Sequence, residues 1–154
     1  MEFPSFVTGF SDGEACFSVS FSFRKKLKTG IEVRPSFCIA QHKRNLSLLK
    51  EVRDYFDCGS IRFSKRDQNY KFEARSIKDL TDKVVPHFRK HKLQSTKKED
   101  FEKFDIICQL ISSNHHRSKD YLVQIIELAY QMNESGKRKH TKEKLLKHLS
   151  KMKR

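Results

Sequence analysis

The stretch from Val7 to Ala15 combines glycines and acidic side chains at spacings that favour metal chemistry. The apolar spacing predicts a helix from Pro4 to Gly13, and Gly9 and Gly13, four positions apart, fall on one face of it. Without side chains on that face, two copies of the helix can approach almost backbone to backbone. Such an approach brings Glu14, at the helix end, beside its twin. Two carboxylates held together attract divalent cations, and oxygen ligands suit Mg²⁺.

A metal ion between two such sites can activate water and stabilise the leaving oxygen of a phosphodiester. A single copy of the stretch supplies only one Glu14, so a site with paired carboxylates would need a second chain. The alternative is an ordinary N-terminal core helix whose glycines permit tight packing.

Two strands are expected directly after this helix, because the period of the apolar residues changes to two from Ala15 to Lys26 and again from Glu32 to Ile39. Lys28-Thr29-Gly30 is typical of the turn between them. One face of the pair is apolar, and the other is polar and basic. The apolar face carries Phe17, Val19, Phe21, Phe23, Val33, Pro35, Phe37 and Ile39.

The rest of the chain alternates between helical and strand patterns. A helix is expected at Leu46–Phe56, a hairpin at Ser60–Lys65 and Asn69–Ser76, and a helix at Ile77–Phe88. Three further helices are expected at about Lys98–Ser112, Lys119–Met132 and Thr141–Met152. The order α-ββ-α-ββ-α predicts an α+β fold with a four-stranded antiparallel sheet. We expect a single domain, 1–154, with a core at about 4–112 and a C-terminal helical extension at about 113–154.

Charge points to a polyanionic partner. Among 154 residues, 33 Lys+Arg face 19 Asp+Glu, a net charge of +14, and nucleic acid is the leading candidate. An anionic membrane surface is the rival, but the apolar residues form no basic amphipathic anchor, and a merely basic protein is the plain alternative. The four cysteines form no CxxC pair, which argues against a zinc finger and for reduced thiols. No apolar run approaches a membrane span, and the N-terminus is no secretory signal, so an intracellular protein is expected.

The nonapeptide Val7-Thr8-Gly9-Phe10-Ser11-Asp12-Gly13-Glu14-Ala15 resembles the LAGLIDADG motif, and the element order resembles the core of that homing endonuclease family. The resemblance implies a homodimeric, site-specific double-strand DNA endonuclease that uses Mg²⁺, with Mn²⁺ as a substitute. It implies that Glu14 and the carbonyl of Gly13 are metal ligands and that Asp12 has a capping role. The implied dimer interface comprises Phe6, Gly9, Phe10 and Gly13. The chain departs from the motif at Thr8, Ser11, Glu14 and Ala15.

Further catalytic positions are implied by the same resemblance. Gln41 closes the second strand, where the family often has a polar residue that orients water, although a plain surface amide is the alternative. Lys97 and Lys98 resemble a basic segment that precedes the next helix in the family. One of them would stabilise the charged transition state, and we favour Lys97. Solvated charges at a helix start are the alternative.

The polar sheet face is the expected DNA-binding surface, since a curved sheet fits the major groove. A strand of roughly ten residues at ~3.3 Å per residue spans ~10 base pairs at ~3.4 Å each, so a dimer covers ~20, as an approximate palindrome. Positions at hairpin tips and in the basic C-terminal segment would hold phosphates. The expected contacts are Ser18, Ser20, Ser22, Arg24, Lys26, Lys28, Glu32, Arg34, Ser36, Cys38, Ser60, Arg62, Ser64, Lys65, Arg66, Lys71, Glu73, Arg75, Lys98, Lys139 and Lys142.

Two other classes of function compete with an endonuclease. One is a non-cleaving binder on the same scaffold, either a splicing maturase that grips intron RNA or a DNA-binding regulator. The other is a ribosomal or RNA-binding module, which the lack of aromatic residues on the polar sheet face disfavours. The acid at position 14 favours cleavage, because a pure binder has no need of paired carboxylates. By resemblance, the gene lies in an intron of an organellar or microbial genome, and the protein acts in a mitochondrion, a chloroplast or a microbial cytoplasm.

Overall fold

The computed structural model describes residues 2–133 and 138–152, so parts of the predicted domain at 1, 134–137 and 153–154 lie outside the described residues. The strands are β1 (Ala15–Phe23), β2 (Ile31–His42), β3 (Ser60–Ser64) and β4 (Asn69–Ala74). They form one antiparallel sheet in the order β1-β2-β4-β3, which confirms the predicted α+β class.

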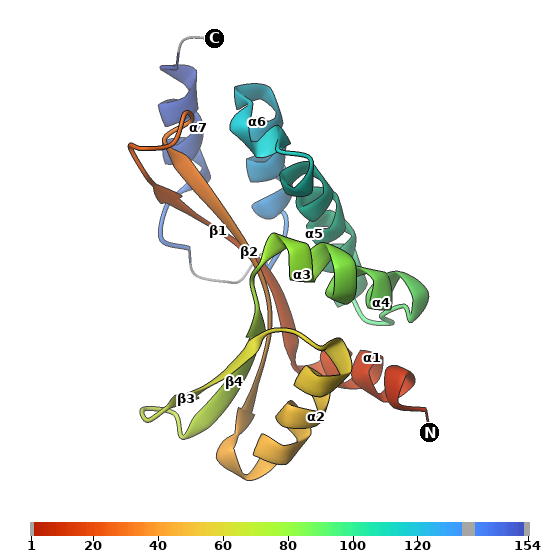
Figure 1. Cartoon of the computed structure of the whole chain (residues 1–154). Coiled ribbons are helices and arrows are strands. Elements are labelled where there is room, and N and C mark those ends of the chain that lie inside the picture. Colours follow the sequence, from red (N-terminus) through yellow and green to blue (C-terminus); the bar gives the residue numbers. More distant parts are fainter. Residues whose placement is uncertain (1, 134–137, 153–154) are drawn as a thin grey trace.

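Helices cover one side of this sheet. They are α1 (Phe3–Glu14), α2 (Leu46–Phe56), α3 (Ile77–Asp79), α4 (Val85–Lys90), α5 (Lys97–Ser112), α6 (Lys119–Ala129) and α7 (Lys142–Ser150). Figure 1 shows α1 to α6 gathered on one side, so the opposite side of the sheet is left open. The described helices include none long and apolar enough to cross a membrane.

The first hairpin has the expected alternation. Phe17 pairs with Phe37 and Val19 with Pro35, and these residues are buried on the helix-covered side. Gly30 has φ +74°, the left-handed backbone that the tight turn before β2 requires and that glycine adopts without strain. Phe23 departs from the expected apolar face, since it is 36% exposed. It lies at the end of β1, where His140, Lys144 and His148 of the C-terminal segment contact its ring.

The second hairpin also lies where its pattern predicts. α2 ends at Phe56, where the left-handed backbone of Asp57 (φ 54°) stops the helix, and Gly59 (φ +85°) turns the chain into β3. A side chain at Gly59 would come within 2.8 Å of the backbone of β4, which explains why glycine is needed there. β4 pairs with β2 on one side and with β3 on the other, so β1 and β3 are the edges of the sheet.

The helical region after β4 is not the uniform α-helix expected at Ile77–Phe88. It comprises α3, a π-helical segment at Leu80–Val84 and then α4. Pro86 lies in the first turn of α4 and has no N–H to donate to the preceding turn. The missing hydrogen bond accounts for the π-helical turn before it, which is wider than an α-helical turn.

A cluster of aromatic rings fills the space between the sheet and the helices. Phe17 in β1 contacts Phe88, Phe101 and Phe104 at centroid distances of 5.2–5.4 Å. α5 brings two of these rings to the sheet, and α6 and α7 extend the core through buried leucine and isoleucine side chains. The sheet is therefore rigidly supported from behind along β1 and β2.

Candidate active site and nucleic-acid interface

Glu14 lies where α1 meets the sheet. It is the last residue of α1, and β1 starts directly at Ala15. The Glu14 side chain is exposed, and within the described part of the chain its carboxylate has no hydrogen bond or ion pair. A carboxylate held at a fixed backbone position without a protein partner fits a cation ligand.

Asp12, two residues earlier, has different surroundings. Its carboxylate accepts hydrogen bonds from the backbone N–H groups of Gln94 (2.7 Å) and Ser95 (3.1 Å) and from the Ser95 hydroxyl (2.5 Å). Partial burial acts against ionisation, but these hydrogen bonds and nearby Lys97 hold the pKa of Asp12 below its ordinary value. Asp12 therefore fastens the 94–95 loop to α1, which agrees with the structural role that the resemblance implied.

The 94–95 loop leads into α5 and so places Lys97. The Lys97 ammonium donates a hydrogen bond of 3.0 Å to the carbonyl oxygen of Ser11, in the last turn of α1. Lys97 is half-buried, whereas Lys98 is exposed. Of the two predicted lysines, only Lys97 thus contacts the helix that carries Glu14.

The α1 face that carries Gly9 and Gly13 is left open by the described part of the chain. A Cβ atom added at Gly9 or at Gly13 would meet nothing within 4 Å. Beside the glycines, the rings of Phe3, Phe6 and Phe10 stack in a row, with centroids 5.7 and 5.6 Å apart, and all three are only half-buried. The predicted interface residues therefore share an open surface of small and aromatic groups.

Gln41 lies near the end of β2, two residues beyond Ile39, which pairs with Ala15. By strand alternation it follows Phe37 and Ile39, which are buried, and its amide oxygen accepts a hydrogen bond from Asn45 Nδ2 (2.9 Å). No described contact joins Gln41 to Glu14, and its catalytic role stays a prediction.

The open sheet face carries the predicted DNA contacts. Two glutamates on this face, Glu32 and Glu73, form ion pairs with several of its basic side chains. Glu32 forms ion pairs with Arg24 and Arg34, at 3.0 and 3.1 Å. The hydrogen bond from Arg34 is the largest cause that lowers the pKa of Glu32. Each carboxylate thus orients neighbouring basic side chains before any ligand binds.

Glu73 has the same role in the second hairpin. It lies within 3.7 Å of the charged groups of Arg62, Lys71 and Arg75 and accepts a hydrogen bond from Ser36 (2.8 Å). Burial acts against ionisation, but these partners hold the pKa of Glu73 below its usual value. Ser36 is only 8% exposed because Glu73 lies over it, so it is less accessible than the pattern of the strand predicted.

The remaining predicted contacts are distributed over the face, its edges and the hairpin tips. Ser20, Lys26, Lys28, Ser60, Lys65, Arg66 and Lys139 are exposed, and Ser18, Ser22, Cys38, Ser64 and Lys142 are half-buried. Lys142 pairs with Glu127 at 2.6 Å, so part of its charge is used within the chain. The open face and the tips of both hairpins nevertheless make one cationic surface.

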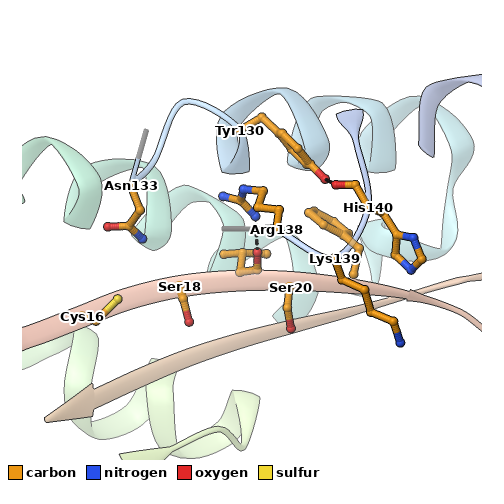
Figure 2. Close-up of a pocket in the computed structure, with 10 residues that line it drawn as sticks. Cys16, Ser18, Ser20, Tyr130, Asn133, Arg138, Lys139 and His140 are labelled. Atoms are coloured by element: carbon orange, nitrogen blue, oxygen red, sulfur yellow. Dashed lines mark hydrogen bonds between the residues drawn. The ribbon is translucent and has the colours of Figure 1, made fainter. Parts of the chain in front are cut away.

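The C-terminal segment covers the outer edge of β1, a role that its sequence does not predict. Asn133 Nδ2 donates to the carbonyl oxygen of Phe17 (2.6 Å), and the Arg138 guanidinium donates to that of Val19 (2.8 Å). Arg138 also lies over the Tyr130 ring, 4.3 Å from its centroid. Figure 2 shows these side chains beside β1. Together with the strand they partly enclose a cavity of about 530 Å³. The basic composition of the segment had suggested phosphate contacts only.

Cys16 and Cys38 are also neighbours. They are direct register partners of β1 and β2, on the open side of the sheet. The Cys38 thiol donates a hydrogen bond that holds the pKa of Cys16 at about 7, with a smaller contribution from Lys97, and the pKa of Cys38 is raised. The strand pattern places both cysteines on the polar face, and only Cys38 is among the predicted DNA contacts.

Comparison with known proteins gives one family. Residues 7–108 match the family model described as LAGLIDADG endonuclease. A "Probable intron-encoded endonuclease 2" of Neurospora crassa is 32% identical over 131 residues, which cover 84% of this chain but only 29% of the relative. The chain thus spans less than a third of that protein's length.

Solved structures have the same fold. The crystal structure of the homing endonuclease I-TnaI is 38% identical, with a TM-score of 0.83, and the match covers 96% of this chain and 95% of that one. A structure described as I-SmaMI bound to an uncleaved DNA target in the presence of calcium ions is 28% identical, with a TM-score of 0.85. That match covers 96% of this chain and 49% of the I-SmaMI chain.

Proposed function

The chain belongs to the LAGLIDADG endonuclease family, and from this premise we propose that it is a site-specific endonuclease that cuts both strands of a long, roughly palindromic DNA duplex as a homodimer. The observation that carries the proposal is the position of Glu14: an exposed carboxylate without a partner among the residues that the structure describes, at the end of a helix whose glycine face is open. A second copy packed on that face brings the two carboxylates together.

The metal proposed for this site is Mg²⁺, as the family resemblance implies. The described residues of one chain contain no cluster of three acidic, histidine or cysteine ligands, so one chain offers half a site. Glu14 and the Gly13 carbonyl from each of two chains give a set of oxygen ligands, which suits a hard cation. When bound, such an ion supplies an activated water and charge stabilisation at the phosphodiester.

The chain's own residues would position the duplex around this centre. The cationic sheet face attracts the phosphates, and its arginines reach base edges in the major groove. The ammonium of Lys97, at the end of α1, would lie near the scissile phosphate and stabilise its developing negative charge. β1 has nine residues, which at ~3.3 Å each span about nine base pairs at ~3.4 Å, so two subunits would cover about eighteen.

The known proteins support this proposal in two ways. I-TnaI, similar over nearly its whole length, is described as a homing endonuclease, and I-SmaMI is described with DNA bound. The I-SmaMI chain is about twice as long as the matched part, which is consistent with one longer chain in place of two copies of this domain. The intron-encoded relative supports an intron origin and action inside the cell, in an organelle or a microbial cytoplasm.

The test compares Glu14→Gln with the wild type on a target selected from a randomised duplex library. The variant keeps the size of the side chain but loses its charge, so we expect duplex binding to be unchanged. Loss of a metal contact worth about 4 kcal/mol in the transition state should slow cleavage about a thousandfold. Glu102→Gln, an exposed acid on α5, is the matched control and should cut like the wild type.

Gel shift and single-turnover cleavage in Mg²⁺ give the two readouts. Cleavage by Glu14→Gln at the wild-type rate would contradict the catalytic assignment. Duplex binding without any cleavage by the wild type would instead favour the non-cleaving binder, whether a maturase or a regulator.

A further inference from the structure

Two free cysteines face each other across the first hairpin. Cys16 in β1 and Cys38 in β2 are paired in register, and neither takes part in a disulfide. Cys16 is exposed and Cys38 is half-buried, and both lie on the open side of the sheet. The remaining cysteines differ, because Cys108 is fully buried in α5 and Cys58 lies in the loop before β3.

The hydrogen-bond pattern of β1 fixes the geometry of this pair. The carbonyl oxygens of Phe17 and Val19 point to the outer edge, where Asn133 and Arg138 bind them. The even-numbered residues of β1 therefore direct their backbone groups towards β2, and Cys16 and Cys38 form a hydrogen-bonded antiparallel pair. Such pairs have Cα atoms about 5.5 Å apart, inside the range of about 4.4–6.8 Å that disulfides span. The Cβ atoms of such a pair are about 5.5 Å apart, so the two strands must approach by about 1 Å for the disulfide to form.

We propose that Cys16 and Cys38 form a dithiol site on the open sheet face, which a low-molecular-weight disulfide oxidises to a cross-strand disulfide. The exposed Cys16 sulfur attacks one sulfur of the disulfide RSSR, which gives a mixed disulfide and releases RS⁻; that thiolate takes up the proton lost by Cys16. The Cys38 sulfur then attacks the Cys16 sulfur and displaces the second RSH. Two S–H groups of the protein are oxidised to one S–S bond, and RSSR is reduced to two RSH.

The location gives the site a consequence for DNA. Cys16 lies two residues beyond Glu14 and Cys38 among the predicted contacts, so a bound duplex should cover both thiols. This consequence rests on the proposed function, whereas the dithiol chemistry does not.

The first experiment treats the full chain with oxidised glutathione and maps disulfides by mass spectrometry after digestion without reducing agent. We expect free thiols to fall from four to two per chain, a cross-linked peptide that joins positions 16 and 38 without retained glutathione, and reversal by dithiothreitol. Cys38→Ser should stop at the mixed disulfide and retain one glutathione at Cys16. Cys16→Ser should form no internal disulfide, and Cys58→Ser, the matched control, should behave like the wild type.

Two results would overturn the dithiol site: stable glutathione on Cys16 of the wild type, or a wild-type pattern in Cys38→Ser. Circular dichroism of each variant verifies the fold. The second experiment repeats the oxidation with saturating duplex DNA, and we expect the cross-link to form several-fold more slowly. An unchanged rate there would overturn the placement of DNA on this face while leaving the dithiol site intact, so the two failures are distinguishable.

Discussion

Two carboxylates in α1 lie two residues apart and have opposite surroundings. Three donor groups of Gln94 and Ser95 form hydrogen bonds to the Asp12 carboxylate, whereas Glu14 has no partner among the described residues. The difference separates a fastening residue from a ligand, because a carboxylate that already accepts three protein hydrogen bonds has little capacity left for a cation. Sequence spacing alone does not tell which of the two acids is the metal ligand. Their surroundings depend on a loop about 80 residues further along the chain.

Lys97 and Lys98 provide a matched pair for the next test at this scale. Only Lys97 reaches α1, where it donates to the Ser11 carbonyl, so only its charge is fixed beside the proposed reaction centre. We expect Lys97→Met to slow single-turnover cleavage about a hundredfold, the usual cost of losing one charge-stabilising donor, with little change in duplex affinity. Lys98→Met should cleave within about twofold of the wild type, since exposed charges contribute little. A larger defect in Lys98→Met would reverse the assignment.

At the scale of elements, a buried hydrogen-bond network joins α1 to α2 and α4. The Thr8 hydroxyl donates to the His91 carbonyl (2.9 Å), so it accepts from His87 Nε2 (3.0 Å), and His87 Nδ1 accepts from the Tyr55 hydroxyl (2.7 Å). This arrangement requires a neutral imidazole with its proton on Nε2. Burial, with a smaller effect from His91, lowers the pKa of His87 to about 4.

Stability should therefore depend on pH through His87. In the unfolded chain the imidazole titrates near 6.5, so the unfolded state binds its proton more tightly than the folded state. The stabilisation is complete above pH 6.5 and is lost as the pH falls towards 4, and the full shift corresponds to about 3 kcal/mol. We expect His87→Gln to reduce the loss of stability between pH 6.5 and 4 by about that amount in denaturant titrations.

Tyr55→Phe is the control for this prediction. It removes one hydrogen bond but leaves the imidazole buried, so it should cost about 1 kcal/mol at neutral pH and retain the pH dependence. Equal pH dependence in His87→Gln and the wild type would exclude His87 as its source.

Some features of the helices and strands follow from local sequence patterns, and others do not. The boundaries of α2 and the pairing of Phe17 with Phe37 follow from apolar period and turn residues, and both agree with expectation. Contacts that depend on strand order do not follow, because period-two alternation says nothing about which strands are neighbours. The burial of Ser36 by Glu73 arises only because β4 pairs with β2. For the same reason, the sequence pattern does not predict that β1 is an edge strand or that Arg138 binds its outer backbone.

At the scale of the whole molecule, the sheet has one protected edge. Asn133 and Arg138 cover the outer side of β1, which limits pairing of that edge with another chain. The open α1 face, by contrast, has glycines and a row of half-exposed rings, which favours association through helices. A dimer formed there would place two sheets side by side, with both Glu14 residues at the junction.

A substitution at Gly9 tests the proposed dimer without disturbing the fold of the single chain. Because a Cβ atom at Gly9 would meet nothing within 4 Å among the described residues, Gly9→Leu should fold normally and gain about 0.8–1 kcal/mol of helix propensity. The leucine would clash only with a partner helix, so sedimentation should show a monomer where the wild type is a dimer. Cleavage should fall to background while the thermal melt is retained. Ser47→Leu, an exposed position on α2, should remain dimeric and active, and an intact Gly9→Leu dimer would place the interface elsewhere.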